Sequence, residues 1–429
     1  MHHVKTAILS MLCWLVILPL SAAQAQTYTV LHAFTGHQDG ANPLAGLILD
    51  GAGNLYGTTY GGGNMMLDTC NSAGCGIVFK MTRRNSAWVL TPLNTFNLYN
   101  GAGSLGPVLF GPDSLLYGST SGGGNGNCFQ GPFEGCGVVY SLQPPATACH
   151  TTVCSWTENL IYQFATLEDG FYPGGNLVFD QAGNLYGTTE YGGTGGCFGD
   201  GCGTVFELTR SGSGWVKTTI GDYNNGGPEG LFSGLIIDRA GNLYGSSDEG
   251  GSANYGTVYE LTRSGSGWTT TIIHSFTSVG TGAYADGGLV MDQAGNLYGT
   301  TDGGGASNGG IVFELSPSNG GWNYSVIWNL AGPGSGPTGS LAMDAAGNLY
   351  GTTYGGGAFQ CGNVFKLAPS GGQWSFTDLY DFTCGNDGGH PQAGVTLDAN
   401  GNLYGTTYQY GPNGNCLGVG CGVVWEITP

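Results

Sequence analysis

Charged side chains are scarce in this sequence, and basic ones are the scarcest. Charged residues make up 9% of the 429 residues, with 9 Lys or Arg against 28 Asp or Glu and a formal net charge of -19 at pH 7. A protein that binds nucleic acid or an anionic membrane needs clustered Lys and Arg to neutralise phosphate groups. The composition therefore excludes nucleic acid as a partner.

Long apolar runs are absent beyond the first 25 residues. Residues 7–20 are apolar, a weakly basic start precedes them, and Ala23-Gln24-Ala25 supplies a small-x-small cleavage sequence. This order is typical of a secretory signal peptide. An uncleaved membrane anchor is the alternative, but the run is short for a spanning helix of about 20 residues. We predict that residues 1–25 are a signal peptide cleaved near Ala25, and that the mature chain is secreted or periplasmic, without a membrane span.

A strict glycine triplet is also missing, although the chain has 85 glycines, so a collagen-like fold is excluded. What recurs instead is a short sequence whose clearest copy, residues 344–353, reads Asp-Ala-Ala-Gly-Asn-Leu-Tyr-Gly-Thr-Thr. Its Tyr-Gly pair returns about every 50 to 70 residues, which predicts a propeller or a solenoid. The seven tyrosines are Tyr56, Tyr117, Tyr186, Tyr244, Tyr298, Tyr350 and Tyr404.

Each unit contains four strand-like segments separated by turns rich in Gly, Asn and Ser. In the first unit they are residues 46–49, 54–59, 76–79 and 88–96, which are rich in apolar, β-branched and aromatic residues. In the turn before Tyr-Gly, we expect the Asp to cap its own backbone. The Tyr, Trp and Phe positions recur in every unit, so we expect them to pack between blades and not to form a site.

The two ends of the chain divide one unit between them. The seventh unit ends at Pro429 after its third segment, and residues 28–34 match the missing fourth one. An open solenoid has no reason for such a division, whereas a closed ring uses it to hide an exposed strand edge. The sequence therefore predicts an all-β, seven-bladed β-propeller of four-stranded blades over residues 26–429. We expect the N-terminal strand to complete the last blade and close the ring, with residues 27–34 beside 423–428.

Cysteines gather in the loops between the second and third strands. These loops share one face with the loops that enter the first strand, and we call it the upper face. Apart from Cys13, the cysteines number twelve and suit disulfides in an exported chain, whereas zinc is disfavoured because no His or second pair lies at zinc spacing. We therefore predict no metal site at the cysteines. The predicted bridges are Cys70–Cys75, Cys128–Cys136, Cys149–Cys154, Cys197–Cys202, Cys416–Cys421 and, for lack of local mates, Cys361–Cys384.

The repeat resembles that of a known family. Gly-Asn-Leu-Tyr-Gly-Thr-Thr, a glycine run and then Gly-x-Val-Phe-x-Leu are similar to the GloVer tandem repeat of bacterial exported "choice-of-anchor" proteins. The resemblance covers nearly all of the mature chain and implies propeller-like repeats and export. It implies no catalytic residues, because that family has no established activity.

Functional asymmetry must appear where the repeats differ, and the residue after Gly-Thr-Thr differs. Consecutive units carry carboxylates there in one half of the ring and tyrosines in the other. Such a pair of arcs on the upper face suits a sugar or a cationic ligand, through stacking, hydrogen bonds and cation–π contacts. The acidic arc consists of Glu190, Asp248 and Asp302, and the aromatic arc of Tyr354, Tyr408 and Tyr60.

Three entry loops also share an aspartate, at Asp39, Asp169 and Asp387. Their oxygens could line the channel mouth and bind a ligand or Ca²⁺. The alternative is that they cap turns. His37 and His390 lie near Asp39 and Asp387 in the sequence, so a catalytic His–Asp pair is a further hypothesis, although loop histidines are more often solvated.

Two functions remain open from the sequence. The first is a non-catalytic, exported binding propeller, a monomer without a cofactor, whose upper face binds an extracellular glycan, a cationic small molecule or a protein. The second is an extracellular enzyme on polysaccharide, a lyase or a glycosidase. A glycosidase needs two carboxyl groups roughly 5 to 10 Å apart, so carboxyl separations discriminate between them.

Overall fold

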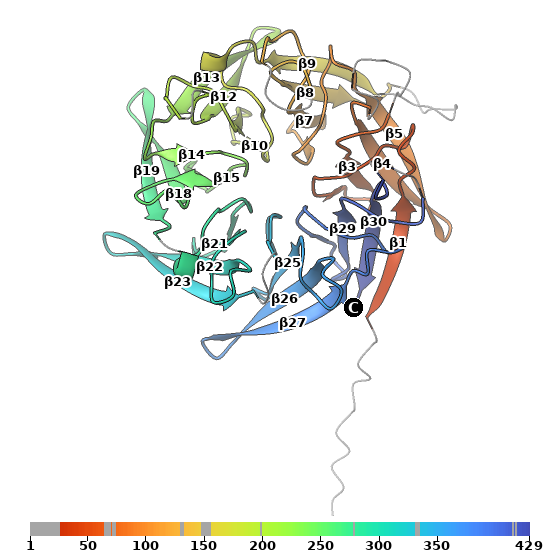
Figure 1. Ribbon diagram of the computed structural model, residues 1–429. Coiled ribbons are helices and arrows are strands. Elements are labelled where there is room, and N and C mark those ends of the chain that lie inside the picture. The colour runs from red at the N-terminus through yellow and green to blue at the C-terminus, as the bar shows by residue number, and fades with distance from the viewer. Residues whose placement is uncertain are drawn as a thin grey trace, which may run out of the picture.

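The computed structural model describes residues 26–63, 70, 74–128, 133–146, 156–197, 200–277, 279–330, 335–413, 416 and 418–429. In these residues the chain forms seven antiparallel, four-stranded sheets. The sheets stand as blades around a common axis, and β1 lies beside β30 where the two ends of the chain meet (Figure 1). The predicted seven-bladed propeller is confirmed, and residues 1–25, which we predict to be a signal peptide, lie outside the described residues.

The blades follow one another along the chain, each running from a short inner strand to a long outer one. The first two are β2 (Ile48–Leu49), β3 (Leu55–Thr58), β4 (Ile77–Arg84) and β5 (Ala87–Thr95), then β6 (Leu109–Phe110), β7 (Leu116–Thr120), β8 (Val138–Gln143) and β9 (Thr157–Gln163). The third and fourth are β10 (Val178–Phe179), β11 (Leu185–Thr189), β12 (Thr204–Ser211) and β13 (Gly214–Asp222), then β15 (Ile236–Ile237), β16 (Leu243–Ser247), β18 (Thr257–Ser264) and β19 (Gly267–Ser275).

The remaining three blades close the circle. They are β20 (Val290–Met291), β21 (Leu297–Thr301), β22 (Ile311–Ser318) and β23 (Gly321–Asn329); β24 (Ala342–Met343), β25 (Leu349–Thr353), β26 (Asn363–Ser370) and β27 (Gln373–Asp381); and β28 (Thr396–Leu397), β29 (Leu403–Thr407), β30 (Val423–Thr428) and β1 (Thr27–Ala33). A small sheet of β14 (Pro228–Glu229) and β17 (Glu249–Gly250) and two 3-10 turns, η1 (Leu167–Asp169) and η2 (Val279–Thr281), complete the described elements. The inner strands are shorter than the four-residue apolar runs that the sequence offered.

The glycine of each Tyr-Gly pair makes room for an aromatic side chain. A Cβ on Gly187 would lie 2.5 Å from Phe206 and 2.6 Å from Leu177, so any larger residue would displace the core. Each partner aromatic is fully buried. The tyrosine of the pair in turn packs against a tryptophan of the next blade at six of the seven seams, with ring centroids 5.8–6.3 Å apart. This confirms that the repeated aromatics pack between blades.

The two threonines that follow Tyr-Gly have different structural roles. The first reaches the next blade, as where the Thr352 hydroxyl donates to the Ala393 carbonyl at 2.7 Å. The second stays in its own blade, where the Thr353 hydroxyl donates to the Gly355 carbonyl and accepts the Asn363 N–H. Gly-Thr-Thr therefore fixes both the seam between blades and the start of the upper-face loop.

Ring closure follows the predicted register. β1 pairs with β30 from Thr27↔Thr428 to Ala33↔Val423. Tyr28 stacks on Tyr380 with centroids 3.9 Å apart, and the Thr406 hydroxyl donates to the Ala45 carbonyl of the first blade. The seam before this blade lacks its tryptophan, because the chain offers Gln26 at that place.

Five of the six predicted disulfides are formed, including the long-range Cys361–Cys384 bridge. The four local bridges are Cys70–Cys75, Cys128–Cys136, Cys197–Cys202 and Cys416–Cys421. The sixth, Cys149–Cys154, lies outside the described residues. Disulfides in this number are typical of an oxidising, extracellular or periplasmic environment. Among the described residues, no helix has the length and apolarity to cross a membrane.

Candidate functional site

A backbone contact repeated in all seven blades positions the residue after Gly-Thr-Thr. Its N–H donates to the carbonyl of an entry-loop residue of the same blade, over 2.8–3.2 Å. That entry-loop residue has a left-handed backbone in every blade, with φ between +31° and +65°. The pairs are Tyr60–Asn42, Ser121–Gly103, Glu190–Tyr172, Asp248–Gly230, Asp302–Tyr284, Tyr354–Gly336 and Tyr408–His390. The six residues that the sequence singled out thus occupy equivalent positions around the upper face.

A cavity of about 450 Å³ lies at the centre of this face. One residue from an equivalent position of each blade lines it, and three tyrosines complete the wall. The blade positions are Leu44, Leu105, Gly174, Phe232, Asp286, Thr338 and Gln392, and the tyrosines are Tyr60, Tyr172 and Tyr408. A narrower space of about 100 Å³ is lined by these seven positions and by the residues that follow them in each blade. The cavity therefore lies where all seven blades converge.

Glu190 is the most buried carboxylate of the acidic arc, with 3% of its surface exposed. Burial raises its pKa to about 8, the charge of Asp248 adds to the rise, and a hydrogen bond with the Tyr191 side chain opposes it. Its Oε2 atom has no hydrogen-bond partner. Burying an ionised carboxylate without partners is costly, so Glu190 keeps its proton at neutral pH.

Asp248 and Asp286 face each other and share a hydrogen bond. Burial raises the pKa of Asp286 well above its usual value, and the charges of Asp248, Asp302 and Glu190 add to the rise. Burial also raises the pKa of Asp248. Two carboxyl groups in such contact cannot both ionise at low cost, so the pair shares a proton. Asp302 is more exposed, at the rim, and partial burial is the one cause that raises its pKa.

Asp286 is the functional candidate that the sequence reasoning missed. It lies three residues before the first apolar residue of its inner strand, at Leu289, and is the one carboxylate among the seven lining positions. Comparing that position across the units would have found it, whereas we compared only the residue after Gly-Thr-Thr. The acidic arc thus gains a member that lines the cavity directly.

The aromatic side of the cavity is built by Tyr60, Tyr172 and Tyr408. The side chains of Tyr60 and Tyr172 share a hydrogen bond, and burial raises the pKa of both hydroxyls. Tyr354, the third predicted aromatic, does not line the cavity and stacks instead on His390 with ring centroids 4.5 Å apart. Two of the three predicted tyrosines therefore reach the cavity.

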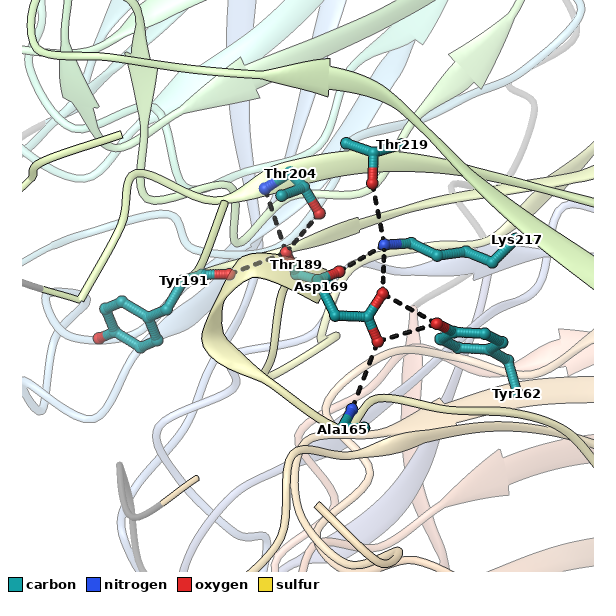
Figure 2. A network of polar contacts seen from close by, with 8 residues as sticks. All are labelled: Tyr162, Ala165, Asp169, Thr189, Tyr191, Thr204, Lys217 and Thr219. Atoms are coloured by element: carbon teal, nitrogen blue, oxygen red, sulfur yellow. Dashed lines mark hydrogen bonds and ion pairs between the residues drawn. The ribbon is translucent and has the colours of Figure 1, made fainter. Parts of the chain in front are cut away.

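The entry-loop aspartates lie at turns, where protein donors already surround their carboxylates. Asp169 accepts hydrogen bonds from the Tyr162 hydroxyl at 2.8 Å and the Ala165 N–H, and it pairs with Lys217 at 2.8 Å (Figure 2). Asp39 accepts from the Thr35 backbone N–H and side chain and from His32, and Asp387 accepts from Thr383, Gly385 and Tyr380. Turn capping explains their recurrence, and Ca²⁺ binding there stays a prediction.

The two hypothetical His–Asp pairs are not formed. Asp39 contacts His32 at 3.0 Å, and His37 is exposed. His390 Nδ1 lies 2.9 Å from the Tyr354 carbonyl oxygen and not against Asp387. The geometry therefore does not support a catalytic role for His37 or His390 beside these aspartates.

One group of potential metal ligands occurs among the described residues, Cys197, Cys202 and Glu229. Its two sulfur atoms are joined in a disulfide, which leaves no thiolate to bind a metal. The four carboxylates at the cavity, all described, do not qualify, because no three of them bring their oxygens within 4.8 Å of one another.

Comparison with known protein families identifies the family of the repeat. The model of the Gloeobacter/Verrucomicrobia repeat matches residues 66–268, 126–333 and 232–429. The chain belongs to this family. The match confirms the resemblance that the repeated motif indicated, over most of the propeller. No curated protein matches the chain.

Solved structures resemble this repeat protein only distantly. An ancestral GH74 enzyme is 14% identical with a TM-score of 0.51, over 82% of this chain and 46% of the enzyme. A putative oxidoreductase (glucose dehydrogenase) of Thermus thermophilus is 15% identical, with a TM-score of 0.42, over 93% of this chain and 100% of that one. A putative 6-phosphogluconolactonase of Bacteroides uniformis is 12% identical, with a TM-score of 0.46, over 76% and 84%. At 14% identity, the likeness to the GH74 enzyme shows the fold alone.

Proposed function

We propose that this member of the Gloeobacter/Verrucomicrobia repeat family is an exported, non-catalytic binding propeller whose ligand, a glycan or a cationic small molecule, occupies the central upper-face cavity. The observation that carries the proposal is that one cavity joins tyrosine faces to Asp286, a carboxylate with an oxygen that has no hydrogen-bond partner. Its volume lies within the range of roughly 300 to 1,000 Å³ found for small-molecule sites. Export, with removal of residues 1–25, is part of the proposal and is supported by the disulfides.

An enzyme acting on polysaccharide is the second candidate, and Glu190 is the observation that favours it. A carboxyl group with a pKa of about 8 carries a proton at neutral pH and has the state of a general acid. However, Glu190 is almost fully buried, and Asp248 and Asp286 are close enough to share a hydrogen bond. A glycosidase pair stands roughly 5 to 10 Å apart, so the dyad itself does not fit that chemistry. Binding is therefore the better-supported function.

The test is a glycan and small-molecule array probed with the mature protein, residues 26–429. We expect one ligand class to be retained, and Tyr408→Ala, which removes a face of the cavity, to lower the affinity at least tenfold. Tyr99→Ala is the matched control, because Tyr99 is 75% exposed and lies outside the cavity. If both variants retain the ligand equally, the binding site does not lie in the cavity. If the protein retains no ligand at all, the proposed binding function is wrong. Release of cleaved product from a retained glycan would establish the enzyme instead.

A further inference from the structure

Four carboxylates near the cavity have no cationic partner in the described part of the protein. The ion pairs there involve Asp39, Asp50, Asp113, Asp169, Asp180 and Glu207, and none involves Glu190, Asp248, Asp286 or Asp302. The structure describes all eight Lys and Arg residues of the mature chain, so each of them has been considered as a partner. The negative charge around the cavity is therefore left uncompensated by the fold.

Unsatisfied atoms accompany this charge. Asp286 lines the cavity and its Oδ1 atom has no hydrogen-bond partner. Glu190 is 3% exposed, and its Oε2 atom has no hydrogen-bond partner either. Buried polar atoms are nearly always hydrogen-bonded in folded proteins, so the unpartnered oxygen of Asp286 is the position at the cavity where a ligand or an ordered water would supply a hydrogen bond.

We propose that the missing partner is an organic ammonium ion, whose charged nitrogen contacts Asp286 beside Asp248 and whose body packs against Tyr60, Tyr172 and Tyr408. This rests on the proposed function and names the ligand class for the same cavity. A metal ion fits less well, because no three of the carboxylates bring their oxygens together. A small ion would also leave most of the 450 Å³ empty, whereas an ammonium with an organic body fills it and gains cation–π contacts.

Binding should release a proton. The free pair Asp248–Asp286 shares one, and an ammonium that replaces it forms R–NH₃⁺ with two carboxylates, while the displaced proton passes to the buffer. The other acidic groups that face the pair are Glu190, Asp302 and Glu249. Glu190 keeps its proton at neutral pH, so the charges of Asp302 and Glu249 are the ones that also favour the cation. Affinity should therefore rise with pH until the pair is fully ionised, and a neutral ligand should show neither the rise nor the release.

The experiment is isothermal titration calorimetry of the mature protein with two matched probe pairs. A glucosamine trisaccharide is compared with its fully N-acetylated form, and 1,5-diaminopentane with 1,5-pentanediol, which separates an amino sugar from an alkylamine as the source of the ammonium. Each titration is made in two buffers of different ionisation enthalpy, at pH 6 and pH 8. We expect the cationic member of at least one pair to bind at least tenfold more tightly than the neutral member, with release of up to one proton.

Substitution of the pair supplies the control. Asp286→Asn should abolish the discrimination and the proton release, while Glu134→Gln, an exposed acid on the same face, should leave both unchanged. Melting temperatures of both variants should stay at or above that of the wild type, and Asp248→Asn repeats the test if Asp286→Asn folds poorly. If the neutral probes bind as tightly as the cationic ones and Tyr408→Ala weakens their binding, the ammonium inference is wrong but the binding function stands. Failure of all four probes to bind at millimolar concentration would also overturn the ammonium inference, and the array would still decide the function separately.

Discussion

The lower-face turns and the upper-face cavity hold the same chemical group in opposite environments. In the turn between β24 and β25, Asp344 accepts hydrogen bonds from the Ala346 N–H, the Asn348 N–H and side chain, and the Tyr350 hydroxyl, over 2.7–3.0 Å. Partial burial raises its pKa, but these bonds outweigh burial and hold the pKa below its usual value. At the cavity, burial wins and the pKa of Glu190 rises to about 8.

The difference separates the carboxylates that build the fold from those that the fold merely tolerates. The turn aspartate recurs with the repeat, and even the divergent turn of the second blade keeps one, because Asp113 accepts the Tyr117 hydroxyl at 2.7 Å. The carboxylates near the cavity occur in only three of the seven blades, and Glu190 and Asp286 each keep one oxygen without a hydrogen-bond partner. A buried polar group without a hydrogen-bond partner lowers the stability of the folded protein, and such groups are expected where they serve binding. The comparison therefore assigns a structural role to the turn aspartates, and it supports the proposed binding role of the carboxylates near the cavity.

The largest expected effect is a gain in stability on neutralising the buried acid. Between pH 4.5 and about 8, the folded protein keeps the Glu190 proton that the unfolded chain releases. The contribution of Glu190 to stability is therefore full below pH 4.5 and is lost as the pH rises to about 8. Glu190→Gln should remove that loss and stabilise the protein by about 3 kcal/mol at pH 7, with little gain at pH 4. Urea unfolding at pH 4, 6 and 8 measures this. A gain that is equal at all three values would contradict the assignment.

The upper face has disulfides where the lower face has aspartate turns. The Cys361 carbonyl accepts the His390 N–H at 2.8 Å, and the Cys361–Cys384 bridge ties that loop to the end of β27. Replacing both cysteines by Ser should lower stability by about 3 kcal/mol, by the loop-entropy estimate for a loop of 23 residues. Replacing Cys416 and Cys421, which close a shorter loop, is the control and should cost less. Thermal unfolding without reductant compares them, and an equal loss would mean that loop length does not set the effect.

A turn aspartate should behave oppositely to Glu190. Asp344→Ala removes four hydrogen bonds and should destabilise the protein by about 2 kcal/mol at pH 7. Because the folded pKa is lowered, the wild-type advantage is present above the unfolded pKa and is lost as the pH falls through the folded one. Urea unfolding from pH 7 down to pH 3 should show the two proteins converging. A difference that is constant with pH would assign the loss to backbone conformation and not to the carboxylate.

The sequence predicts nearly all of the fold because the fold is the repeat. Seven copies of Tyr-Gly with their spacing give the blades, and the divided unit gives the closure at β1 and β30. The odd bridge Cys361–Cys384 followed from five cysteines at one place in the unit. What the sequence did not reveal is the length of the inner strands, because their apolar residues extend beyond the two that pair in each.

The site was predicted in part, and the limit is geometric. Equivalent positions share a place on the ring, so Glu190, Asp248 and Asp302 were found together. None of the three lines the cavity, because the side chains that reach it depend on side-chain direction, which the repeat does not encode. Asp286 belongs to a second set of equivalent positions closer to the axis, and its contact with Asp248 joins two loops that lie 38 residues apart.

The smallest expected effect on stability is at the rim, where Asp302 is exposed. Asp302→Asn should change the free energy of unfolding by less than about 0.5 kcal/mol, in contrast to Asp344→Ala, because exposed positions without partners contribute little. It should still weaken binding of a cationic probe about two- to threefold at low ionic strength, since its charge acts on the Asp248–Asp286 pair. That effect should fade in roughly 0.5 M salt, where screening is strong. Titrating 1,5-diaminopentane at low and high salt, beside urea unfolding, tests both halves. A large loss of stability with unchanged affinity would place Asp302 among the residues that build the fold and would blur the division between the two faces.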